Sequence, residues 1–463
     1  MRRLHELRVL EQIVPGMRHT RGLLQFNAYH RYTVDEHSLR AVDAVTKYQS
    51  DPSMAGQIYR SLRQKRTLHL AVLIHDLGKG FVEDHSELGA KMATQLGQRL
   101  GLPTSETETL HFLVLKHLRM SHLAQQFDIH DEKVIVNFAV EVGSIENLQM
   151  LYLLTLADLE SVGPGVLNEW KRGLLADLYS HTHDILSSDS PEDASNQWVL
   201  KSRQELSALT KERPQPAWWK EQIAGLPRSC LLGCPAWQLV EELDRLRTLP
   251  HQEAIAWGRY LPDHDAIEYT VGTYEEISPG IFHKLTGLLS SQRHQILSAE
   301  INTLAGGLVL DRFYVKDLDT NGAPSPERMR EVSDLLKSAL RESAATRPVF
   351  RKVWQPKSSN NSSQIQHLPT QVTFDNRTVA KHTIISVFAY DQLGLLYTIA
   401  RALFELGLSI STAKIGTHLD QVVDVFYVTD QSGQKIESPE QLSQIRERLL
   451  TEIANLSATK DNA

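Results

Sequence analysis

The spacing of apolar residues changes near residue 264 of this 463-residue chain, and the change divides the sequence into two kinds of fold. Before it, apolar residues recur three and four positions apart, as in Leu88, Met92 and Leu96, which is typical of amphipathic helices. After it, short apolar runs such as 266–271 alternate with helical stretches. A chain of this length also exceeds one ordinary domain. We therefore expect a multidomain protein, with an all-α domain followed by α+β domains.

The α+β part repeats itself. We expect the order strand, helix, strand, strand, helix over 266–271, 281–289, 296–301, 307–315 and 327–340, and again over 383–389, 394–406, 409–415, 422–429 and 439–454. A recurring order of elements at a fixed period indicates duplicated structural units. The chain therefore ends in two similar α+β domains.

Composition places the boundaries between these parts. A stretch rich in proline and tryptophan, 211–262, is expected to be a connector. A polar stretch of low complexity begins soon after Pro348 and is expected to be flexible. The expected domains are an all-α domain at 1–210, the connector 211–262, an α+β domain at 263–346, a flexible linker at 347–380 and a second α+β domain at 381–457.

Each α+β unit has a glycine where its first strand turns into its first helix. Gly280 precedes Ile281 in the first unit, and Asp391 and Gly394 precede Leu395 in the second. Glycine lets a ligand approach the backbone closely, and the N–H groups that open a helix suit a carboxylate. These five residues are candidates for binding a small molecule. The alternative is that the units serve only for packing or dimerisation.

Charge and composition exclude several classes of protein. The net charge of −7 disfavours a general nucleic-acid binder. No apolar run approaches the roughly 18 residues that a bilayer-spanning helix needs, and the N-terminal stretch lacks the apolar core of a secretion signal. Two cysteines, Cys230 and Cys234, cannot form a disulfide framework. We expect a cytoplasmic protein that binds neither nucleic acid nor membrane.

The strongest chemical signal is a His-Asp pair. An apolar run, 70–74, ends in His75 and Asp76, and a glycine on each side of Lys79 breaks the pattern just after it. Adjacent histidine and aspartate offer one nitrogen and one oxygen ligand at a fixed point, a mixture that Mg, Mn, Fe or Zn accepts. Lys79 could hold a phosphate oxygen as a point charge. The stretch predicts a divalent metal site that acts on a phosphate.

Two further residues are candidates to complete this site. Asp158 is the lone carboxylate on an otherwise apolar helix expected over 148–159. Burying a charge costs several kcal/mol unless it is paired or binds a metal. His37 lies where a polar cluster opens another apolar-periodic helix. Other single histidines are expected to be surface or structural residues, namely His5, His19, His69, His111 and His181.

A family resemblance joins these segments. Residues 30–185 resemble the HD-superfamily metal-dependent phosphohydrolases, whose pattern is a His, then His-Asp, then a distant Asp. The segments HRYTVDEHSLR, HLAVLIHDLGKG, DHSELGAKMA, LKHLRMSHLAQ and LYLLTLADLESVGPGVLNEWK, in this order, resemble the HD region of the bifunctional PII uridylyltransferase/uridylyl-removing enzymes. The two tail units resemble the two ACT domains, of ferredoxin-like βαββαβ type, that end those enzymes. The resemblance covers the chain from about residue 8 onward.

The resemblance implies roles for particular residues. It gives a core metal site formed by His37, His75, Asp76 and Asp158, with His85 and His117 as the residues that could complete a second one. Lys79 and Asp76 are the expected catalytic residues. The family commonly has a His-His pair where this chain has Lys116 and His117, so the number of ions stays open. The expected cofactor is Mn²⁺ or Mg²⁺, with Fe or Zn as alternatives.

The resemblance also implies a function in nitrogen regulation. The HD domain would remove UMP from a uridylylated PII signalling protein, and the ACT domains would sense glutamine or another amino acid and could support a homodimer. The family's nucleotidyltransferase motif, a Gly-Ser followed by paired aspartates, does not precede His37, so we do not expect transferase activity from this chain alone.

Three alternatives to this function stay open. The first is a non-catalytic regulatory protein that responds to an amino acid. The second is one chain of a split PII uridylyltransferase. The third, and the least favoured, is a hydrolase of a free nucleotide such as a dNTP or an alarmone, because no base-recognition motif is visible.

Overall fold

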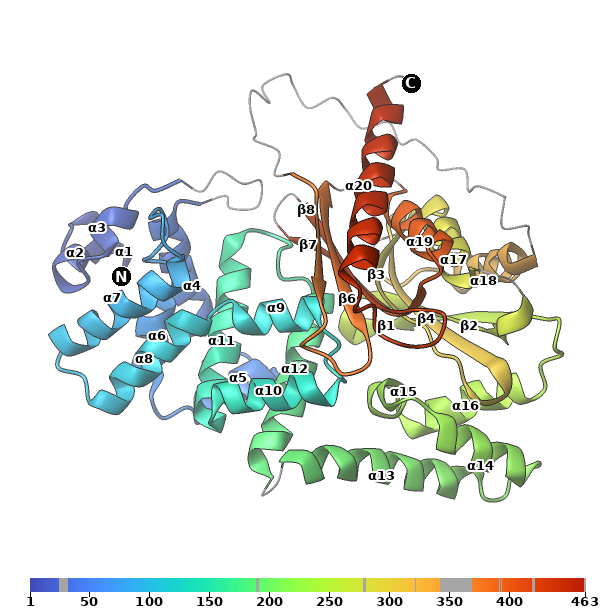
Figure 1. Ribbon diagram of the computed structural model, residues 1–463. Coiled ribbons are helices and arrows are strands. Elements are labelled where there is room, and N and C mark those ends of the chain that lie inside the picture. The colour runs from blue at the N-terminus through green and yellow to red at the C-terminus, as the bar shows by residue number, and fades with distance from the viewer. Residues whose placement is uncertain are drawn as a thin grey trace. The chain divides into compact units, whose positions relative to one another are not determined.

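The computed structural model describes residues 1–24, 32–188, 191–277, 280–320, 322–341, 369–390, 392, 394–418 and 421–461. The chain divides into two compact units (Figure 1). The first comprises 1–125 with 135–194, and the second comprises 126–134 with 195–463.

The first unit is all-α, as the apolar spacing predicts. Its helices are α1 Arg2–Glu6, α2 Leu10–Ile13, α3 Met17–Thr20, α4 Val34–Lys47, α5 Met54–Ser61, α6 Lys65–Ile74, α7 His85–Arg99, α8 Thr104–Lys116, α9 Arg119–Gln126, α10 Glu132–Val142, α11 Ile145–Val162 and α12 Glu169–Ser187, the ends of α9 and α10 being counted with the second unit. None of the helices in the described part of the chain combines the length and the apolarity needed to cross a bilayer.

Helix α11 organises this unit. It is buried along most of its length and contacts α4, α6, α8 and α12. The Ser144 hydroxyl accepts a hydrogen bond from the N–H of Asn147 at 3.2 Å and so caps the start of the helix. Because α11 is surrounded by other helices, its single inward carboxylate, Asp158, faces the interior of the unit.

The second unit is built on one antiparallel sheet of eight strands. Their order is β1-β2-β4-β3-β7-β8-β6-β5. The strands are β1 Ile255–Leu261, β2 Ala266–Tyr274, β3 His294–Glu300, β4 Leu308–Asp317, β5 Gln371–Asp375, β6 Thr383–Tyr390, β7 Ser409–His418 and β8 Gln421–Thr429. One face is covered by α17 Ile281–Ser291, α18 Pro326–Arg341, α19 Leu395–Glu405 and α20 Pro439–Asp461 (Figure 1).

The expected connector packs on the other face of the first α+β domain. It contains α14 Pro216–Gly225, α15 Arg228–Gly233 and α16 Ala236–Arg247, preceded by α13 Pro191–Thr210. Trp219 and Leu243 from these helices share an apolar cluster with Leu308 and Leu310 of β4. The fold class is thus confirmed: a helical domain is followed by two α+β domains.

The edge strands differ from the expected element order. Strand β1 lies in the expected connector, and β5 lies in the expected linker at 347–380, of which residues 347–368 fall outside the described residues. Each α+β domain therefore begins with its edge strand and has the element order ββαββα. In the expected order, βαββαβ, the edge strand comes last. Every residue of β1 is half-buried, so the strand lacks the alternation of buried and exposed positions that reveals a strand in a sequence.

The strand register confirms the internal repeat. Val271 pairs with Asp311 in the first α+β domain, and Val387 pairs with Asp424 in the second. In both α+β domains the strand after the first helix, β3 or β7, has an irregular register shortly before an alanine. That alanine, Ala299 or Ala413, pairs with a phenylalanine on the next strand. The two units are joined where β3 pairs with β7.

The buried carboxyl group of Asp311 gives a prediction about stability and pH. Asp311 is fully buried, and its Oδ1 accepts a hydrogen bond from the N–H of Asn302 at 3.3 Å. Burial raises its pKa to about 8, against an ordinary value of about 3.9. The folded protein then keeps a proton that the unfolded chain releases above about pH 4, so this group's contribution to stability falls as the pH rises from about 4 to 8.

Asp311→Asn is expected to remove this pH dependence. The free energy of unfolding of the variant minus that of the wild type should be about 1–4 kcal/mol larger at pH 8 than at pH 5. Urea denaturation at the two pH values measures the difference. Asp334→Asn, at an exposed position on α18, is the control. A constant difference between Asp311→Asn and the wild type at both pH values would contradict the prediction.

Candidate metal centre

Helix α6 delivers the His-Asp pair into the interior. Its apolar residues Val72 to Ile74 are buried, and His75 caps its carboxyl end. His75 and Asp76 are 0% and 1% exposed. Two ionisable side chains at this depth need partners of opposite charge or a metal ion.

The four predicted core ligands meet at one point. The Nε2 atoms of His37 on α4 and His75 lie 3.2 Å apart. Asp158 Oδ1 lies 3.0 Å from His37 Nε2 and 3.5 Å from His75 Nε2. Asp76 Oδ2 lies 3.6 Å and 3.4 Å from the same two nitrogens. Residues far apart in the sequence thus present two nitrogens and two carboxylates to one small volume.

Hydrogen bonds fix which ring nitrogen each histidine presents. His75 donates from Nδ1 to the carbonyl oxygen of Val72 at 2.8 Å. The Ser161 hydroxyl donates to the carbonyl oxygen of Asp158 at 2.8 Å, so it accepts from Nδ1 of His37 at 3.2 Å. Since Nδ1 of each ring donates to these acceptors, Nε2 is the nitrogen that each histidine can offer to a metal once it is unprotonated, and this assignment follows from the hydrogen-bond partners.

A second ligand cluster shares Asp76. Ligand atoms of Asp76, His85 and His117 lie within 4.8 Å of one another. His117 donates from Nδ1 to the carbonyl oxygen of Val114 at 2.7 Å, which again leaves Nε2 facing the cluster. Among the described residues, the buried Nε2 atoms of His85 and His117 have no hydrogen-bond partner. Unsatisfied inward nitrogens beside a carboxylate fit a divalent ion.

The charges in the cluster balance one another. Burial would lower the pKa of His75, but the carboxylates of Asp76 and Asp158 raise it to about 10. Burial opposes ionisation of these two carboxyl groups as well, yet His75 and neighbouring cations hold their pKa values well below the usual range. Burial and the charge on His75 lower the pKa of His117 to about 4. The two carboxylates and neutral His117 are in the protonation states that a cation requires, whereas charged His75 must release its Nε2 proton when it binds a metal.

The two lysines beside the site differ in their partners. Lys79 Nζ lies 2.7 Å from Asp76 Oδ2 and remains partly exposed, so its ammonium group reaches both the site and solvent. Lys116 pairs with Glu141 at 2.7 Å. The sequence-based suggestion of a phosphate-binding lysine therefore applies best to Lys79.

The predicted small-molecule turns have the expected backbone shape. Gly280 and Gly394 have φ values of 72° and 86° and precede α17 and α19, whose first residues are Ile281 and Leu395. Side chains other than glycine rarely adopt such angles. Asp391 lies outside the described residues. Helices α17 and α19 pack against each other, so the two turns belong to neighbouring helices.

Comparisons with known proteins identify two of the domains. Residues 34–142 match the HD domain family. This chain contains an HD domain. Residues 371–457 match the ACR9-like, ACT-like domain family, so the second α+β unit is an ACT-like domain.

The chain is similar to a group of enzymes over nearly its whole length. It is 34% identical to the bifunctional uridylyltransferase/uridylyl-removing enzyme of Rhodospirillum rubrum, over 97% of this chain and 48% of that protein. The enzyme of the same name from Azospirillum brasilense is 33% identical, over 99% and 49%. The chain spans about half the length of these curated relatives. With its HD and ACT-like domains, it resembles their C-terminal part.

Sequence reasoning missed Ser161. It lies three residues after Asp158, one helical turn along α11, so both face the same way. That spacing from a candidate ligand was the available signal. Its hydroxyl is buried and orients His37 in the HD domain.

Ser161→Ala is expected to weaken metal binding about 10–100-fold, because His37, a candidate ligand, loses the hydroxyl that orients its ring. Competition with a fluorescent chelator measures the dissociation constant for Mn²⁺. Ser180→Ala is the matched control, since the hydroxyl of Ser180 also bonds a helical carbonyl but is exposed on α12. Equal Mn²⁺ affinity in Ser161→Ala and the wild type would show that His37 needs no such support.

Proposed function

We propose that this protein is a metal-dependent phosphodiester hydrolase of the uridylyl-removing type. Its substrate would be a PII signalling protein that carries UMP on a tyrosine. The observation that carries the proposal is the convergence of His37, His75, Asp76 and Asp158, with the ring protons held on the far side of both histidines. The similarity to uridylyl-removing enzymes supports the choice of substrate.

The side chains divide the chemical work. His37, His75, Asp76 and Asp158 would hold one ion, and His85 and His117 would hold a second with Asp76 between them. A divalent ion supplies a water of lowered pKa and polarises the phosphoryl oxygens. The low pKa of Asp76 keeps it ionised, so it serves as a ligand and as the charge partner of Lys79. The ammonium group of Lys79 would offset charge that develops on the phosphoryl oxygens.

The ACT-like part would regulate this chemistry. The backbone N–H groups that open α17 and α19 after Gly280 and Gly394 suit the carboxylate of an amino acid, for which we propose glutamine. If glutamine changes the affinity of the HD domain for its substrate, the substrate must change the affinity for glutamine by the same factor.

Release of UMP from uridylylated PII by the purified protein with Mn²⁺, with and without glutamine, tests the proposal. Release that glutamine stimulates would support both the hydrolysis and the regulation. Release that ignores glutamine would contradict the regulatory part alone. Stoichiometric metal binding without turnover would contradict the hydrolase and would favour a non-catalytic regulatory protein.

A further inference from the structure

The segment between two of the candidate ligands is the feature that carries a further inference. Asp76 and His85 have ligand atoms within 4.8 Å of one another. Residues 77–84 connect them, so this loop begins and ends at the metal centre of the HD domain. Every residue of the loop is therefore at most four positions along the chain from one of these two candidate ligands.

Local contacts fix the shape of this loop. The carbonyl oxygen of Lys79 accepts a hydrogen bond from Nε2 of His19 at 3.1 Å. Gly80 follows with a φ of 86°, a turn that glycine makes without strain. At the other end, the Asp84 carboxylate accepts hydrogen bonds at 2.9 and 3.0 Å from two N–H groups in the first turn of α7. Phe81 and Val82 are thus presented at the tip of a loop that is held at both ends.

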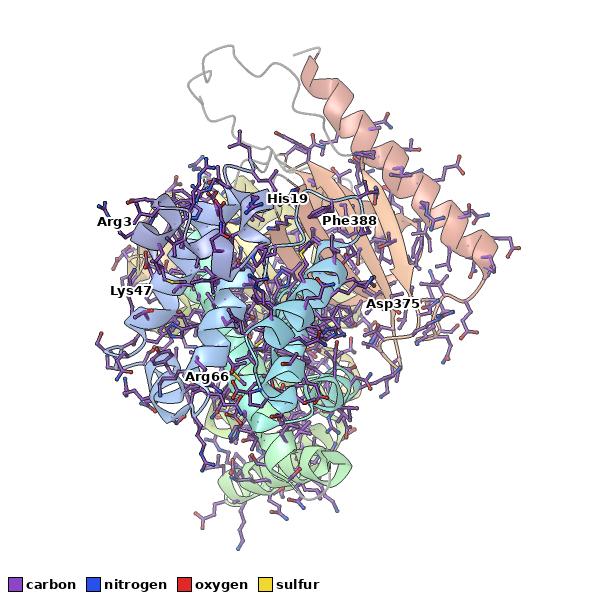
Figure 2. The ribbon with its side chains drawn as sticks, turned by 90° about the vertical axis from the view of Figure 1, so that its left-hand side faces the viewer. Arg3, His19, Lys47, Arg66, Asp375 and Phe388 are labelled. Atoms are coloured by element: carbon purple, nitrogen blue, oxygen red, sulfur yellow. The ribbon has the colours of Figure 1, made fainter. Side chains whose placement is uncertain are left out.

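The aromatic ring at the tip is open to solvent and supported from behind. Phe81 is 43% exposed. Its ring centroid lies 4.1 Å from that of His19, with an angle of 31° between the planes. His19 belongs to α3, outside the segment that matches the HD family, and is labelled in Figure 2. The ring thus contacts His19 and keeps exposed surface with which another planar group can stack.

We propose that Phe81, backed by His19, stacks on the base of the nucleotidyl group whose phosphate the metal centre and Lys79 hold. This inference rests on the proposed hydrolase function and adds a residue that recognises the nucleoside. Successive Cα atoms are 3.80 Å apart, so the Cα atoms of Lys79 and Phe81 lie at most about 7.6 Å from each other. The Lys79 and Phe81 side chains therefore leave the backbone close enough together for one nucleotide to meet both.

Stacking also predicts the kind of selectivity. Every base has a π-face, so stacking on an aromatic ring strengthens binding of any base and depends little on which base it is. The loop should therefore favour nucleotidyl esters over esters without a base, and it should discriminate weakly between uracil and other bases.

Two substrates, one with a base on its ribose and one without, test this inference. They are the 4-nitrophenyl esters of uridine 5′-monophosphate and of ribose 5-phosphate, each assayed with Mn²⁺. The wild type should prefer the uridine ester about tenfold or more in kcat/KM. Phe81→Ala should lose that preference, and Phe81→Trp should retain it. Val82→Ala, which removes an exposed apolar side chain from the same loop tip, should match the wild type.

The outcomes separate this inference from the proposed function. Hydrolysis of both esters with no preference in the wild type, or a preference that survives Phe81→Ala, would overturn the stacking role and leave the hydrolase standing. An equal loss on both esters in Phe81→Ala would also overturn it. If the wild type cleaves neither ester, calorimetric binding of UMP and of ribose 5-phosphate to the Mn²⁺-loaded protein decides. Tighter binding of UMP that Phe81→Ala abolishes would support stacking, and equal binding would overturn it.

Discussion

Asp158→Ala is expected to abolish stoichiometric metal binding and to lower phosphodiester hydrolysis by more than about 100-fold. Asp158 Oδ1 contacts the Nε2 atoms of both His37 and His75, at 3.0 and 3.5 Å. Without this carboxylate the candidate site would keep only one of its two core carboxylates and would lose a negative charge that favours a cation. An effect larger than that of Ser161→Ala follows, because a ligand is lost outright.

Equilibrium dialysis with Mn²⁺ and the rate of UMP release measure the two effects. Glu160→Gln is the matched control, because Glu160 lies two residues farther along α11, pairs weakly with Lys47 at 3.9 Å and does not face the site. Asp158→Ala that keeps one tightly bound ion per chain would show that Asp158 is not a ligand.

Gly78→Ala is expected to destabilise the HD domain and to displace His85. A Cβ atom at position 78 would lie 2.0 Å from the carbonyl oxygen of His85 and 2.9 Å from the N–H nitrogen of Gly89. Both obstacles belong to the backbone of α7, so no side-chain rotation relieves them. Overpacking of this kind costs about 1–3 kcal/mol and sometimes more.

Urea denaturation and Mn²⁺ titration of Gly78→Ala test both consequences. Because His85 belongs to the second ligand cluster, any second ion should be lost before the first. Gly225→Ala on α14 is the matched control, since its added Cβ would lie 3.6 Å from Ala305, an ordinary contact. Unchanged stability of Gly78→Ala would mean that α7 can shift without cost.

Much of the fold and the core of the site could be predicted because the signals were local. The expected strand at 422–429 is close to β8, Gln421–Thr429, because apolar residues fill most of it. Asp158 stood out as a charge within an apolar helix, and the structure places it beside His37 and His75. Binary patterning and the cost of burying a charge both act within one element, so one sequence reveals them.

The remainder depends on contacts between elements. Strand β1 carries no alternation, and it is recognisable only by its pairing with β2. The spacing of Ser161 from Asp158 could mark it as a neighbour of the site, but its partner, His37, is 124 residues away and is identified only by the fold. The pairing of Lys116 with Glu141 likewise brings together two separate helices. Each is a consequence of tertiary packing, which overrides or supplements local preference.

The pairing of β3 with β7 has a consequence for how the two α+β units are related. Ala299 faces Ala413, and each of these alanines pairs with a phenylalanine in its own unit, so they are equivalent positions. The residue before Ala299 pairs with the residue after Ala413, and the residue after Ala299 pairs with the residue before Ala413. This reciprocal pairing is the pattern of a symmetric dimer. Within one polypeptide, the two α+β domains are thus related as the two subunits of a symmetric dimer are. The edges of β3 and β7, which separate domains could use to pair with another copy, are occupied by each other. Because both halves are encoded separately, the sequences of their two glycine turns are free to diverge, so the two proposed effector sites can differ in affinity.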